Sequence, residues 1–172
     1  GRFGVVSVGS GARVTSSYGI SIGRDAESAG GTAVGNMAHA VSQATALGDQ
    51  ASTEGGSNNP IAIGYNADAK NSRALTIGSN ARSESEAIAI GHSTVAEANA
   101  VVIGQAAQGN GIQDTVVGHS AKSDGSAGIA LGYGAHTMGD KGISIGWFAR
   151  APKSGLVIGA GYVDDNYILS GQ

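Results

Sequence analysis

Large aliphatic residues recur along this chain at two positions of a short motif that ends in glycine. In the segment 88–91, Ile-Ala-Ile-Gly, two isoleucines flank a small residue, and close copies of this segment run through the sequence. The residue before the glycine is aliphatic in every copy. The residue three before it is aliphatic in all copies except those with Thr32, Thr45 and Thr115. Such alternation, rich in β-branched side chains and bounded by glycine, predicts one short strand in each copy.

The spacing of the motif predicts a solenoid. The motifs recur at a nearly constant interval, longest between Gly48 and Gly64, and end at Gly9, Gly23, Gly35, Gly48, Gly64, Gly78, Gly91, Gly104, Gly118, Gly132, Gly146 and Gly159. Alanine follows the glycine by three residues in ten units, usually with a small residue two positions later, which predicts a second strand. One such coil buries too little apolar surface to fold alone. We therefore expect an all-β parallel β-roll solenoid of about 12 coils with 13–14 residues each.

The aliphatic and the small residues of the first strand must point to opposite faces. Because large aliphatic residues normally fill a core, we expect them to line the inside of each coil: Ile22, Ile63, Ile77, Ile88, Ile90, Ile103, Leu131, Ile145 and Ile158. The small residues between them are too apolar for a solvated face, which predicts contacts with partner chains through Ala62, Ala89, Val102, Val116, Ala130 and Val157. On this assignment Ile90→Asp blocks folding, whereas Ala89→Asp blocks association.

The repeat resembles the YadA-like head of trimeric autotransporter adhesins. The resemblance rests on the aliphatic-small-aliphatic-Gly unit followed by x-x-Ala-x-small, and it covers Val5 to about Tyr162. It implies a left-handed β-roll, a parallel homotrimer and display on the bacterial cell surface through an outer-membrane anchor outside this segment. The implied function is non-enzymatic attachment to a host extracellular-matrix protein, a cell-surface glycan or other bacteria.

The pattern fades after Gly159. Residues 1–162 are expected to form one repeat domain, and residues 163–172 a C-terminal cap or transition segment. The neck and coiled coil that usually follow such heads are not seen, so a trimeric phage tail-fibre segment that binds a bacterial surface polysaccharide remains an alternative, located in the virion tail. No signal peptide or membrane-spanning run is visible, which favours a fragment of a longer protein.

Composition and motifs give no indication of an enzyme. The net charge of −3 comes from scattered residues, so a nucleic-acid interface is not expected, and the absence of cysteine excludes thiol chemistry. No zinc-protease, P-loop or nucleophile-elbow motif occurs. His92 and His119 share the position after the glycine two coils apart, about 10 Å, which is too far for one ion. We therefore expect no catalytic residues, cofactor or metal, and no direct membrane insertion.

The position after each glycine carries much of the unusual surface chemistry. It supplies the candidate ligand-contact residues Tyr65, His92, His119, Tyr133 and Trp147. Tyr133 and Trp147 fall on adjacent coils, with Phe148 beside Trp147. Two interpretations are open: an apolar platform for a sugar ring or a partner's side chain, or packing in the corners between chains. The turn-rich segment 54–60, in the longest unit, is expected to bulge from the coil.

Overall fold

The computed structural model describes residues 3–55 and 58–160. They form a parallel β-solenoid of about 11 turns and contain no helix, which confirms the predicted all-β coil architecture. The chain falls into two compact units, Gly1–Glu86 and Ala87–Gln172. The predicted boundary between residues 162 and 163, and the predicted cap, lie outside the described residues.

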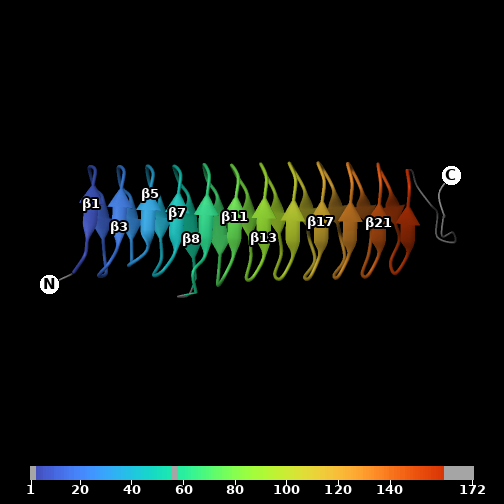
Figure 1. The fold of residues 1–172 in the computed structure, drawn as a ribbon, viewed down its shortest axis with the longest axis horizontal. Helices are drawn as coiled ribbons and strands as arrows, with labels where there is room; N and C mark the ends of the chain where they lie inside the picture. The colour runs from blue at the N-terminus through green and yellow to red at the C-terminus, as the bar shows by residue number, and fades with distance from the viewer. Residues whose placement is uncertain (1–2, 56–57, 161–172) are drawn as a thin grey trace. The chain divides into compact units, whose positions relative to one another are not determined.

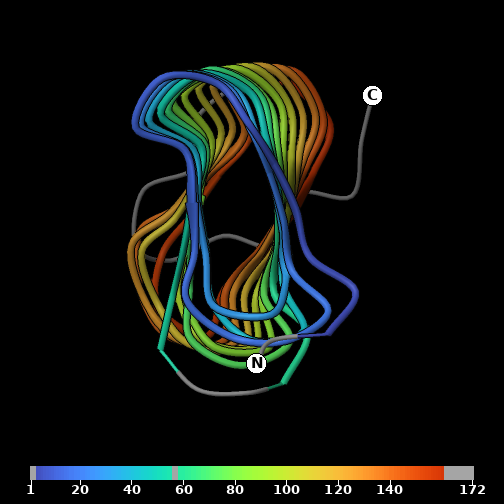
Figure 2. The same cartoon turned by 90° about the vertical axis from the view of Figure 1, so that its left-hand side faces the viewer.

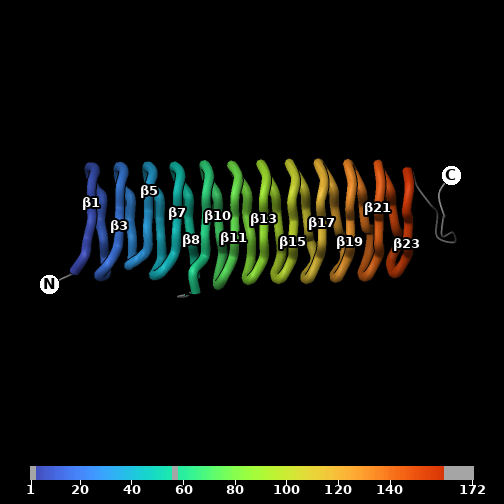
Figure 3. The backbone as a smooth tube through the Cα atoms, viewed as in Figure 1, coloured from blue at the N-terminus to red at the C-terminus, as the bar shows by residue number. Residues whose placement is uncertain are grey.

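The first unit contains two parallel sheets that share each coil between them. One has the order β1-β3-β5-β7-β9-β11 and the other β2-β4-β6-β8-β10-β12, with neighbouring strands side by side in Figures 1 and 3. The odd-numbered strands are β1 (Val6–Val8), β3 (Ile20–Ile22), β5 (Thr32–Val34), β7 (Thr45–Leu47), β9 (Ile61–Ile63) and β11 (Leu75–Ile77). The even-numbered strands are β2 (Arg13–Val14), β4 (Glu27–Ser28), β6 (His39–Ala40), β8 (Ser52–Glu54), β10 (Asp68–Lys70) and β12 (Arg82–Ser83).

The second unit repeats this arrangement. Its odd-strand sheet contains β13 (Ile88–Ile90), β15 (Val101–Ile103), β17 (Thr115–Val117), β19 (Ile129–Leu131), β21 (Ile143–Ile145) and β23 (Leu156–Ile158). Its even-strand sheet contains β14 (Val95–Ala96), β16 (Gln108–Gly109), β18 (Lys122–Ser123), β20 (His136–Thr137) and β22 (Arg150–Ala151). Pairing is in register with the motif: Ala89 lies opposite Val102, and Val102 opposite Val116. Equal positions of successive coils therefore form columns.

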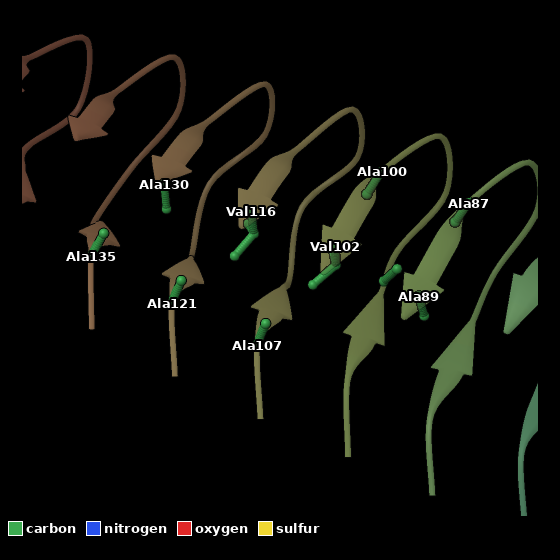
Figure 4. Close-up of a cluster of buried hydrophobic side chains, with 10 residues drawn as sticks. Ala87, Ala89, Ala100, Val102, Ala107, Val116, Ala121, Ala130 and Ala135 are labelled. Atoms are coloured by element: carbon green, nitrogen blue, oxygen red, sulfur yellow. The ribbon is translucent and has the colours of Figure 1, made fainter. Parts of the chain in front are cut away.

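The interior of each coil is made of small side chains. The coil that contains β9 and β10 buries four alanines, Ala62, Ala67, Ala69 and Ala74. In the second unit Val102, Val116 and Ala130 point into the coil from their strands, as Figure 4 shows. Because a coil this short has strands of only two or three residues, its two sheets enclose little space, and side chains no larger than valine, threonine or aspartate fill it.

The assignment of the two faces from the sequence was therefore wrong. The aliphatic residues expected inside point outward: Ile22, Ile103 and Ile158 are 39%, 37% and 49% exposed. Their counterparts are half-buried: Ile63, Ile77, Ile88, Ile90, Leu131 and Ile145. The residues expected at a partner interface are buried inside the coil: Ala62, Ala89, Val102, Val116, Ala130 and Val157. The fully buried side chains of the coils are no larger than valine, threonine or aspartate, so the small residues of the strand face inward and the isoleucines face outward.

Hydroxyl groups that replace interior alanines connect the two sheets. Ser21 Oγ donates a hydrogen bond to the Arg13 carbonyl oxygen at 2.9 Å. Ser144 Oγ donates to the His136 carbonyl oxygen and accepts from the Ala151 amide, both at 2.9 Å. Buried polar groups are tolerated when they have such partners, so serine can stand in an alanine column without a large loss of stability.

The column glycines are required by the close approach of successive coils. Gly118 has a φ of +145° and Gly132 a φ of +130°, values that residues with a side chain rarely adopt. A Cβ atom on Gly118 would overlap the carbonyl oxygen of Gly132 in the next coil. The glycine that ends each motif thus permits both the turn and the stacking.

Gly118→Ala is expected to destabilise the second unit strongly. The backbone conformation alone costs about 1–3 kcal/mol for alanine, and the overlap with the Gly132 carbonyl adds to it. Gly159→Ala is the matched control, because Gly159 has a φ of +126° with no described atom within 4 Å of the added Cβ. Urea unfolding should show a lower midpoint for Gly118→Ala than for Gly159→Ala. Equal midpoints would contradict the steric argument.

The longest unit, between Gly48 and Gly64, keeps its strands in register. Thr45 of β7 pairs with Ile61 of β9, and Ser52 of β8 pairs with Asp68 of β10. The extra residues therefore fall between β8 and β9, where the bulge was predicted, although residues 56–57 lie outside the described part of the chain. In the end-on view of Figure 2, the chain on either side of these two residues leaves the outline of the neighbouring coils.

Candidate functional site

The odd-strand sheet of each unit presents an apolar surface to the outside. We call the first and third residues of the odd-numbered strands the outward aliphatic face. In the second unit all of these residues are Ile, Leu or Val except Thr115, and in the first unit all except Thr32 and Thr45. Large contiguous apolar patches mark interaction surfaces. A parallel sheet with aliphatic side chains on its outside is typical of strands that are covered on both faces.

The even-strand sheet has a polar outside instead. In the first unit its outward column runs through Arg13, Glu27, His39, Ser52 and Asp68. Arg13 and Glu27 form an ion pair at 2.8 Å between the Nη2 and Oε2 atoms. Each coil is therefore amphipathic from side to side, with one sheet suited to water and the other suited to a partner.

Aromatic rings gather at the turns that follow β17, β19 and β21. The His119 and Tyr133 rings are stacked, with centroids 5.0 Å apart and planes 3° apart. Phe148 meets Tyr133 edge to face at 5.3 Å and Trp147 at 4.8 Å. We call these four residues the aromatic platform. It belongs to the turns between the two sheets, outside the outward aliphatic face.

A missing side chain makes room for the centre of this platform. Gly134 and Phe148 occupy the same turn position of adjacent coils, with φ values of +62° and +50°. A Cβ atom on Gly134 would lie 2.6 Å from Cε1 of Phe148. The Phe148 ring therefore lies over Gly134, and this position brings it against Tyr133.

The platform is accessible in the isolated chain. Trp147 is 63% exposed, Tyr133 48% and Phe148 38%. Aromatic pairs of this geometry contribute about 0.5–1.5 kcal/mol beyond their burial, so the rings hold one another in place although they face solvent. The arrangement is a preformed apolar surface.

The structure brings together three of the five predicted contact residues. His119, Tyr133 and Trp147 belong to the platform. His92 is exposed in the same unit and lies outside this cluster, and Tyr65 is exposed in the first unit. Phe148 was predicted only as a neighbour of Trp147, yet it contacts both other large rings. The sequence indicated this contact through Gly134, which occupies the position of Phe148 one coil earlier and has no side chain to block the ring.

A row of basic side chains runs beside the platform. Lys122, His136 and Arg150 lie in register on the outside of β18, β20 and β22. Asp124 accepts hydrogen bonds from Lys122 Nζ at 2.8 Å, His136 Nε2 at 2.6 Å and Asn110 Nδ2 at 3.0 Å. Partial burial raises the pKa of Asp124, but these hydrogen bonds outweigh burial and lower it to about 2. Asp124 is therefore ionised near neutral pH and offsets the charge of Lys122.

One buried carboxyl was not anticipated. Asp114 stands where neighbouring coils have Ala87 or Ala100, and it is buried in the interior. Its two carboxylate oxygens accept the amide hydrogens of Gly111 and Gly128, each at 2.9 Å. Burial raises the pKa of Asp114, and the backbone hydrogen bonds hold back part of that rise. Because Gly128 belongs to the next coil, Asp114 fastens two coils together.

Within residues 3–55 and 58–160, no three His, Cys, Asp or Glu side chains are grouped so that they could hold a metal ion. The same residues include no helix long and apolar enough to cross a membrane. The site chemistry of the described chain therefore consists of an apolar sheet face, an aromatic platform and a basic row.

No family model matches the sequence, and no curated protein matches it.

Proposed function

We propose that the chain is a YadA-like head segment of a trimeric autotransporter adhesin, a left-handed β-roll that assembles as a parallel homotrimer. The observation that carries this proposal is the outward aliphatic face. The repeat supports it as well, since two short strands, a glycine turn and a polar turn in each short coil are what the resemblance implies. The interface of the proposed trimer is the outward isoleucines rather than the interior alanines.

Energetics favour association through this face. Burial of one methylene-sized group contributes about 0.8 kcal/mol, whereas full burial of an isoleucine side chain contributes about 1.5–3 kcal/mol. The interior is largely alanine, while residues such as Ile90 and Ile103 remain partly exposed. Much of the hydrophobic stabilisation available to the chain is therefore gained only when a partner covers the odd-strand sheet.

A second copy of the chain is the best fit for that partner. Rows of aliphatic side chains recur at the spacing of stacked strands, about 4.8 Å. A parallel copy has the same spacing, so its rows stay in step from coil to coil, whereas an unrelated surface would match only locally. The turns and the even-strand sheet then remain outside and available for ligands.

The proposed activity is non-enzymatic attachment at the bacterial cell surface. Three copies display each surface site three times, and linked sites raise the overall affinity by about 10²–10⁴-fold without new contacts. Weak contacts with a host extracellular-matrix protein or a cell-surface glycan then suffice for attachment.

Beads coated with the purified chain provide the test. We expect them to attach to host cells or immobilised matrix proteins, and beads that carry the association-defective Ile90→Asp chain at equal density to attach at least about 10-fold less. Attachment to purified bacterial polysaccharide alone would favour the tail-fibre alternative. A chain that attaches to none of these surfaces, or attaches equally well as a monomer, contradicts the proposal.

A further inference from the structure

We propose that the aromatic platform and Arg150 together bind a sugar residue that carries a negative charge, either a carboxylate or a sulfate ester. This inference rests on the proposed attachment function and names the ligand class of one site on the displayed surface. It is argued from the geometry of four rings, the position of one guanidinium group and the size of the surface.

The rings provide a stacking surface for a pyranose. A pyranose has a face of C–H groups that packs on an aromatic ring, and Trp and Tyr combine apolar area with a polar edge that can hydrogen-bond to hydroxyl groups. The Tyr133 and Trp147 side chains are both exposed, and the Phe148 ring contacts both. Because these contacts already fix the rings, little side-chain freedom is lost on binding.

The charge follows from Arg150. It lies two residues after Phe148 on β22, between the buried Ala149 and Ala151, so its side chain is on the outside of the coil. Phe148 lies in the turn before β22 and Arg150 begins this strand. Two residues span at most about 7 Å, which places the guanidinium group within reach of a ligand on the platform.

Arg150 differs from the other two members of the basic row. Lys122 and His136 are engaged by Asp124. Among the described residues Arg150 makes no ion pair, and His136 is its partner in register rather than an acid. A guanidinium group offers paired donors that match a carboxylate or sulfate, so the open cation selects an anionic ligand.

The size of the platform favours a sugar over a folded protein. Its rings come from three successive coils, which span about 10 Å at the spacing of stacked strands, the length of one or two sugar rings. A stable protein interface buries about 800 Å² on each partner, far more than four side chains provide. A protein side chain as occupant is an outcome that the experiment below can reveal.

Trp147 is the only tryptophan of the chain, so its fluorescence reports directly on the platform. The intact chain is titrated with 3′-sialyllactose and lactose, and with a heparin hexasaccharide and its desulfated form. We expect a saturable change in fluorescence with at least one charged sugar, at a concentration at least about 10-fold below that needed for its neutral counterpart. The pair that shows the difference identifies the carboxylate or the sulfate.

Two variants that retain Trp147 separate the contributions. Arg150→Gln should bring the charged sugar to the affinity of its neutral counterpart, and Tyr133→Ala should weaken both at least about 10-fold. Tyr65→Ala, at the same repeat position in the first unit, should change nothing. Sedimentation should give the same oligomeric state for all three variants and the parent chain.

Several results would overturn the inference: equal affinity for charged and neutral sugars, no fluorescence change at millimolar sugar, or dissociation of the assembly by Tyr133→Ala, which would place the rings between copies. The attachment function is tested separately. If beads coated with the Tyr133→Ala chain still attach although this chain no longer binds sugar, the proposed function is retained. If the parent chain binds the sugar but beads coated with it do not attach, the proposed function is contradicted and the sugar site is retained.

Discussion

Ala89→Asp is expected to prevent the second unit from folding. Ala89 is fully buried between the two sheets, where the neighbouring residues are alanines and valines. A carboxylate there is too large for the space and has no cation beside it in that cluster. Burial of an uncompensated charge in this way costs about 3–5 kcal/mol of folding stability. Because stability in a solenoid accumulates through neighbour contacts, the adjacent coils lose stability too.

Circular dichroism and urea unfolding measure this effect. The variant should lose its β-sheet signal or unfold at much lower urea than the parent chain. Ala127→Asp is the matched control, since Ala127 is exposed in the same unit with a φ of +57°, a conformation that aspartate tolerates. A folded Ala89→Asp chain with an unchanged midpoint would show that position 89 does not face inward.

Ile90→Asp, one residue later, is expected to leave the coil folded and to break the proposed trimer. Ile90 lies on the outward aliphatic face, and its side chain is half-buried in the isolated chain. In a trimer one aspartate from each copy would enter the same apolar layer, where three desolvated carboxylates have no cation from this face. Removal of such charges from water costs several kcal/mol for each ion.

Analytical ultracentrifugation distinguishes the two states. The parent chain should sediment as a trimer at micromolar concentration, and Ile90→Asp as a folded monomer with an unchanged circular dichroism spectrum. Gln108→Asp, on the outside of β16 and in register with Lys122, should remain trimeric. A parent chain that is monomeric, or an Ile90→Asp chain that still associates, would refute the interface.

The period of the sequence was sufficient to predict the coils, the two strands in each and the columns that they form. It was not sufficient to decide which face of the first strand is inside. Alternation shows that Ala89 and Ile90 point to opposite sides, but the direction depends on the width of the coil. That width follows from coils with strands of only two or three residues, and it was not weighed against the usual preference for a core of large residues.

The aromatic platform was predictable to the extent that it follows the period. Each coil places the residue after the glycine at an equivalent position, so His119, Tyr133 and Trp147 form a column. The contact between Phe148 and Tyr133 depends on the absence of a side chain at Gly134, and comparison of those two positions would have found it. Asp114 depends on amide hydrogens from its own coil and the next, and no regularity of the repeat indicates that.

The alanine interior makes the coils nearly interchangeable. Most coils present a similar interior of small side chains to the coil above and below, as the four alanines around β9 and β10 illustrate. Duplication or deletion of the segment that encodes one coil, by recombination between similar gene sequences, would therefore preserve most inward contacts on both sides of the junction. Contacts specific to one pair of coils, such as that of Asp114 with Gly128, are the exception. We therefore expect a gene for such a chain to gain or lose whole coils in single steps, while the turns are free to diverge.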